Sequence, residues 1–142
     1  MTQIFFYHNA ADRIAATAAL IRKAYAQKKA ILVYAPDAQI AEAIGRHLWM
    51  HPPTGFVPHV RSDSPLAGET PVLIADRLEA PLPQNERLIN LSEKVPPGGS
   101  RFTSVIEVIG QHEAERLSGR ARAKFYKDRG YEIKYFDLSG KN

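Results

Sequence analysis

The chain of 142 residues contains no cysteine, which excludes disulfides, thiolate catalysis and cysteine-bound metals. It has no apolar run close to the roughly 20 residues that a membrane-spanning helix needs. Residues 1–13 also lack the basic start and the long apolar stretch of a signal peptide. These absences predict a cytoplasmic protein that does not enter a membrane.

Nucleotide-binding motifs are missing as well. The turn after the first predicted strand, residues 8–13, has no glycine, although a dinucleotide fold needs glycines there to bring the backbone close to a pyrophosphate. We find no G-x-x-x-x-G-K-S/T phosphate loop and no G-x-S-x-G nucleophile elbow. Asp37 and Asp76 follow strands, but a helix cap and a turn explain them equally well. We therefore expect no cofactor and no catalytic residues.

Three histidines raise the question of a metal. His47 and His51 are one helical turn apart, and His59 follows further along the chain. Pro52 would fray the helix at His51, and no acidic residue lies close by in the sequence. We therefore predict no metal site.

The sequence does contain short apolar segments that alternate with amphipathic ones, and 44% of its residues are hydrophobic. This pattern predicts one domain over residues 1–142 with a parallel sheet covered on both faces. The predicted strands cover residues 4–7, 30–34, 72–75, 88–91, 104–109 and 132–138, of which the last is an edge strand with one wet face. Helices are predicted after Asn9 or Asp12, after Pro36-Asp37, and over residues 112–131.

The segment from residue 47 to residue 71 is unusual. Pro52 and Pro53 end the preceding helix, and no regular pattern follows until Pro71. A loop of this length in a compact domain is usually functional or disordered, and its content of Trp49, Phe56, Val57 and Pro58 argues against disorder. These side chains form either a lid on the core or an exposed anchor for a partner.

The predicted helix 112–131 carries six of the 19 lysines and arginines of the chain but only three acids. Its apolar residues recur at helical spacing as one stripe: Ala114, Leu117, Ala121 and Phe125. A cationic ridge follows one residue out of phase: Arg116, Arg120, Lys124 and Lys127. The helix is either an ordinary solvated helix or the docking edge for an acidic partner. The sequence gives only weak support for direct binding of nucleic acid, because few aromatic residues lie among the cations.

Two segments resemble a known family. Leu48-Trp49-Met50-His51-Pro52, followed by Phe56-Val57-Pro58-His59, resembles the LW-x-x-P and FVPH motifs of the bacterial DNA polymerase III chi subunit. Residues 120–127, followed by Gly130-Tyr131, are similar to the R-x-R-x-K-x-Y-K/R and G-Y/F motif of the same family. The resemblance extends over essentially the whole chain.

The resemblance implies a Rossmann-like three-layer α/β/α fold with a mainly parallel sheet, no nucleotide and no catalytic activity. It implies an accessory subunit of the clamp-loader assembly in DNA replication, which would link the replicase to single-stranded DNA-binding protein by holding the acidic C-terminal tail of that protein. It also implies pairing with the psi subunit or, through the same surface, with a repair helicase. DNA would then be contacted mainly indirectly, in the cytoplasm at the nucleoid.

Matched by position, the resemblance assigns tail binding to Ile109, Arg116, Arg120 and Lys124. It assigns the psi-facing or helicase-facing surface to Trp49, Pro52, Phe56, Val57 and Pro58. Ala123 departs from the pattern, because some members carry an aromatic residue there. The alternative function that the sequence leaves open is a small α/β enzyme or nucleotide-binding protein.

Overall fold

The computed structural model of the chain describes residues 2–50, 58–61, 71–78 and 86–139. Its strands are β1 (Gln3–Ala10), β2 (Ile31–Tyr34), β3 (His59–Arg61), β4 (Val72–Ala75), β5 (Arg87–Asn90), β6 (Ser104–Gly110) and β7 (Ile133–Asp137). Its helices are α1 (Arg13–Ala26), α2 (Ala38–Met50) and α3 (Glu113–Asp128), with a short 3₁₀ turn at Gly99–Arg101. The seven strands form one parallel sheet in the order β3-β4-β2-β5-β6-β1-β7.

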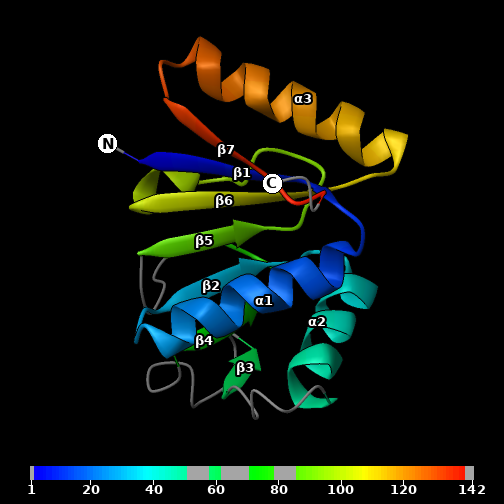
Figure 1. The fold of residues 1–142 in the computed structure, drawn as a ribbon. Helices are drawn as coiled ribbons and strands as arrows, with labels where there is room; N and C mark the ends of the chain where they lie inside the picture. The colour runs from blue at the N-terminus through cyan, green and yellow to red at the C-terminus, as the bar shows by residue number, and fades with distance from the viewer. Residues whose placement is uncertain (1, 51–57, 62–70, 79–85, 140–142) are drawn as a thin grey trace.

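The sheet lies between two helical layers, as the three-layer prediction requires (Figure 1). One core cluster joins α1 and α2 to the sheet through residues such as Ile21, Ile44 and Leu48. A second cluster, which includes Phe6, Phe102 and Tyr126, lies between the sheet and α3. The α/β/α fold predicted from the sequence is therefore confirmed.

The helix starts follow from local capping. The Asp12 carboxylate accepts a hydrogen bond from Ala15 N at 3.1 Å, so Asp12 rather than Asn9 caps α1. The Asp37 carboxylate accepts from Gln39 N at 2.9 Å at the start of α2. These contacts confirm the predicted starts of the first two helices.

The prediction of no regular structure between Pro53 and Pro71 is wrong at one place. Strand β3 pairs in parallel with β4, with His59 opposite Val72. It is only three residues long and has a single aliphatic side chain, Val60, so it carries no alternation that a sequence pattern could reveal. Other parts of that segment lie outside the described residues.

Strand β7 is an edge strand, as predicted, but its wet surface is not confined to one face. Tyr135 is 49% exposed and Phe136, on the opposite face, is 41% exposed. The Phe136 ring stacks on Tyr7 of β1 with a centroid distance of 4.8 Å. This stacking fixes β7 beside β1 and turns Tyr135 toward the α3 side of the sheet.

The apolar stripe predicted on α3 is not the buried face of the helix, although its last member, Phe125, packs against the core. Leu117 is 54% exposed, and Ala114 and Ala121 are exposed as well. The helix instead buries Gly119, Arg122 and Tyr126. The reason is a carboxylate in the sheet below: Glu107 of β6 is fully buried, and Arg122 Nε donates to it at 3.0 Å.

Two further donors complete the shell around Glu107. Tyr126 OH donates at 2.7 Å and Asn90 Nδ2 donates at 3.0 Å. Burial raises the pKa of Glu107, and the Arg122 charge opposes that rise. Burial, followed by the nearby Glu107 charge, raises the pKa of Tyr126 well above its ordinary value, so its phenol stays a donor. The network fixes the rotation of α3 about its axis.

We expect Glu107→Gln to destabilise the fold by about 3–5 kcal/mol, because it leaves the buried Arg122 cation without a counter-charge. The free energy of unfolding in urea measures this loss. The double variant Glu107→Leu with Arg122→Met removes both charges together and should recover most of the stability. A loss below about 1 kcal/mol for the single variant would show that the pair behaves like an exposed one.

Candidate functional site: a cationic groove beside α3

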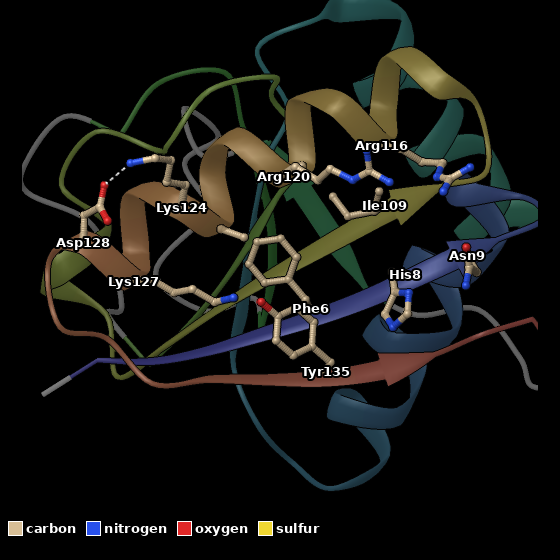
Figure 2. A pocket seen from close by; sticks show the side chains of 12 residues that line it. Phe6, His8, Asn9, Ile109, Arg116, Arg120, Lys124, Lys127, Asp128 and Tyr135 are labelled. Carbon is tan, nitrogen blue, oxygen red and sulfur yellow. Dashed lines mark hydrogen bonds and ion pairs between the residues drawn. The ribbon is translucent and has the colours of Figure 1, made fainter.

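A groove of about 650 Å³ runs between α3 and strand β7, with β1 as its floor (Figure 2). We call it the α3 groove. It is lined by Phe6, His8, Asn9, Ile109, Arg116, Gly119, Arg120, Ala123, Lys124, Lys127, Asp128 and Tyr135. Four elements therefore build it: the strands β1, β6 and β7 and the helix α3.

Four cations line the groove, and they come from successive turns of α3. Arg116 and Arg120 lie at one end, and their guanidinium groups share that end with the Ile109 side chain (Figure 2). Neither of these two arginines holds an ion pair within the described part of the chain. Paired guanidinium groups beside an apolar wall match a carboxylate that is attached to an apolar side chain.

The floor of the groove is aromatic. The Phe6 and Tyr135 rings lie 5.7 Å apart, and the His8 ring meets Tyr135 edge-on at 6.2 Å. Lys127 Nζ lies 5.6 Å from the centroid of the Tyr135 ring. This aromatic surface adjoins Ala123, so ring atoms from β1 and β7 line the groove beside the small side chain of that residue.

The end of the groove at Ile109 is apolar, and it depends on a close approach between α3 and β6. A methyl group on Gly119 would come within 2.9 Å of Ile109 Cδ1, so any larger residue must displace the Ile109 side chain. Ile109 is 5% exposed and forms a wall of the groove. The absence of a side chain at Gly119 therefore sets the position of that wall.

The opposite end carries a carboxylate. Asp128 accepts a hydrogen bond from Lys124 Nζ at 2.7 Å, and both side chains are largely exposed (Figure 2). This hydrogen bond raises the pKa of Lys124. Among the described residues that line the groove, Asp128 is the one aspartate or glutamate.

The structure brings together all four residues predicted for tail binding, Ile109, Arg116, Arg120 and Lys124. Sequence reasoning missed the residues that β1 and β7 supply, because strand order cannot be read from local pattern. It also missed Asp128, although its position four residues after Lys124 was a usable signal.

Two residues of the second predicted surface are described, Trp49 near the end of α2 and Pro58 next to β3, and they lie at the other edge of the sheet (Figure 1). Trp49 is 67% exposed and Pro58 is half-buried. The exposure of Trp49 favours the anchor over the lid for that residue. Pro52, Phe56 and Val57 lie outside the described residues.

The described residues contain no group of three or more histidine, aspartate or glutamate side chains placed to hold a metal ion. His51, half of the predicted histidine pair, lies outside them. None of the helices in the described part of the chain is long and apolar enough to cross a membrane.

The fold and the groove define a class of protein: a three-layer α/β domain that presents a cation-lined groove beside one edge of its sheet. The chain belongs to the DNA polymerase III chi subunit (HolC) family, whose model matches residues 1–134. It is 29% identical over 138 residues to DNA polymerase III subunit chi from Pseudomonas aeruginosa, and the match covers 94% of each chain. The protein is thus an accessory subunit of DNA polymerase III that acts in DNA replication.

A solved structure resembles the fold more distantly. The C-terminal domain of Dbp5 from S. cerevisiae matches 99% of this chain and 92% of its own length, with a TM-score of 0.61 and 13% sequence identity. At this identity the likeness concerns the fold alone.

We expect Trp49→Ala to leave the melting temperature nearly unchanged, because a side chain that is 67% exposed buries little area on folding. A truncation inside the core would instead cost about 3–5 kcal/mol. Thermal unfolding followed by circular dichroism distinguishes the two, with Leu48→Ala, at a fully buried neighbouring position, as the matched core control. Equal losses for the two variants would restore the lid interpretation.

Proposed function

We propose that the α3 groove binds the acidic C-terminal tail of single-stranded DNA-binding protein and so links that protein to the replicase. The resemblance to the chi family suggests this partner, and the groove supplies suitable chemistry. The single observation that carries the proposal is that Arg116, Arg120 and the apolar side chain of Ile109 lie together at one end of a single groove.

Each part of such a tail has a matching part of the groove. The terminal carboxylate meets the two guanidinium groups, which can each donate charge-assisted hydrogen bonds. The terminal apolar side chain packs against Ile109 and the aromatic floor of Phe6 and Tyr135. Acidic residues further upstream extend along α3 toward Lys124 and Lys127.

The second surface serves a different partner in the same proposal. Trp49 and Pro58, together with Pro52, Phe56 and Val57, bind a psi subunit or a repair helicase. Since α2 ends near β3 and the groove lies beside β7, the two surfaces are at opposite edges of the sheet. One chi molecule could therefore hold a clamp-loader partner and a tail at once, and DNA would be reached mainly through the tail-bearing protein. Such a subunit works in the cytoplasm, at the nucleoid.

The test is a titration with a synthetic acidic peptide that ends in Phe with a free carboxylate. A hydrogen bond to a charged group contributes about 1.5–3 kcal/mol, so Arg120→Ala should raise Kd about tenfold or more. Ile109→Phe should also weaken binding, because it fills the apolar end without changing any charge. Isothermal titration calorimetry measures both effects.

Arg129→Ala is the matched control for the loss of one positive charge. The Arg129 guanidinium lies 4.2 Å from the centroid of the Phe125 ring, and this residue does not line the groove. Its removal should change Kd little and only at low salt. Equal losses at Arg120 and Arg129, with Ile109→Phe silent, would reduce the site to a merely basic surface.

Gly119→Ala separates the groove from the stability of the helix. Alanine inside a helix is favoured over glycine by about 1 kcal/mol, which offsets part of the cost of crowding Ile109, so the variant should stay folded with only a modest change in melting temperature. The new methyl group must push Ile109 Cδ1 aside, and peptide affinity should fall. Unchanged affinity would mean that the terminal side chain does not use this end of the groove.

A further inference from the structure

The cations of the α3 groove are not equivalent before a ligand arrives. Arg116 and Arg120 hold no ion pair within the described residues, whereas Lys124 is bound to the Asp128 carboxylate at 2.7 Å. A ligand carboxylate that binds Lys124 must share its ammonium group with the Asp128 carboxylate, which also repels the ligand. A ligand that uses only the two arginines meets no such competitor.

Helix stability does not account for Asp128. It is the last residue of α3, where the helix dipole disfavours a negative charge. Its pair with Lys124 also has the less favourable order, since an acid stabilises a helix more when it precedes the base by four residues. This carboxylate therefore contributes little to the stability of the helix, and its position in the lining of the groove places its charge where a ligand would lie.

We infer that Asp128 acts as an internal competitor for the upstream acidic residues of the ligand and so sets the specificity of the α3 groove. The inference rests on the proposed function. Asp128 reduces the contribution of Lys124 to affinity and repels nearby acidic side chains, because both effects come from the same negative charge. Discrimination then depends on the terminal carboxylate at Arg116 and Arg120, so internal acidic segments of other proteins bind poorly.

The experiment measures Kd for the acidic peptide with a free C-terminal carboxylate at low ionic strength. The four proteins compared are the wild type, Asp128→Asn, Lys124→Ala and the double variant. Asp128→Asn should tighten binding about threefold, a size typical for exposed charges. Lys124→Ala should raise Kd about twofold in the wild-type background and about fivefold in the Asp128→Asn background, because only there does Lys124 act on the ligand without the opposing charge of Asp128. In molar salt, Lys124→Ala should change Kd by the same factor in both backgrounds, because the charges are screened.

Glu132→Gln is the matched control, since it removes the same charge from an exposed residue that does not line the groove. It should leave Kd nearly unchanged. A second peptide, with an amidated C-terminus, tests discrimination: Asp128→Asn should help it by a larger factor than it helps the free-carboxylate peptide, because the amidated form depends more on Lys124.

Three outcomes would overturn the inference. They are an unchanged or weaker Kd for Asp128→Asn, an equal Lys124→Ala factor in both backgrounds, and an equal gain from Glu132→Gln. If the peptide binds and Arg120→Ala weakens it, these results remove only the role of Asp128. If the wild-type protein does not bind the peptide at all, the proposed function falls and this inference falls with it.

Discussion

The rotation of α3 about its axis depends on one buried ion pair, Glu107 with Arg122. A buried carboxylate without a partner would greatly destabilise the fold, so Glu107 in β6 needs a cation from α3 as its partner. Arg122 supplies that cation, and Tyr126 OH adds a second donor at 2.7 Å. Residues two positions apart lie on nearly opposite flanks of a helix. With Arg122 turned toward Glu107, Arg120 and Lys124 therefore lie on the opposite flank of α3, where they line the groove.

The groove follows from this rotation and from the strand order. Because β1 lies between β6 and β7, its Phe6 and His8 form a floor that α3 and Tyr135 enclose on two sides. Aromatic stacking between Phe136 and Tyr7 secures β7 from the opposite face. Gly119 then lets α3 approach Ile109 closely. A cationic helix that would otherwise present only a charged surface thus gains an apolar end and an aromatic floor.

Much of the fold could be predicted from the sequence, because buried parallel strands such as Ile31–Tyr34 are continuous apolar runs with helices between them. The strand His59–Arg61 could not, since three residues with one aliphatic side chain carry no period. That Ile109, Arg116, Arg120 and Lys124 lie in one groove could be expected from the sequence, because they match the chi family by position and three of them share a helical spacing.

The buried face of α3 could not be predicted in the same way. Periodicity counts apolar residues, and here the side chain that is buried is an arginine whose partner lies in another element. Leu117, which the pattern placed in the apolar stripe, is 54% exposed. The residues from β1 and β7 were missed for a related reason, because only the strand order brings Phe6 and Tyr135 beside α3.

The central claim is that the α3 groove recognises the free carboxylate at the end of an acidic peptide. The most direct measurement is a titration of the wild-type protein with two peptides of identical sequence, one with a free and one with an amidated C-terminus, followed by backbone NMR chemical shifts. We predict that the free form binds at least about tenfold more tightly and shifts the amides of Ile109, Arg116 and Arg120. Equal affinities, or shifts confined to other surfaces, would contradict the account.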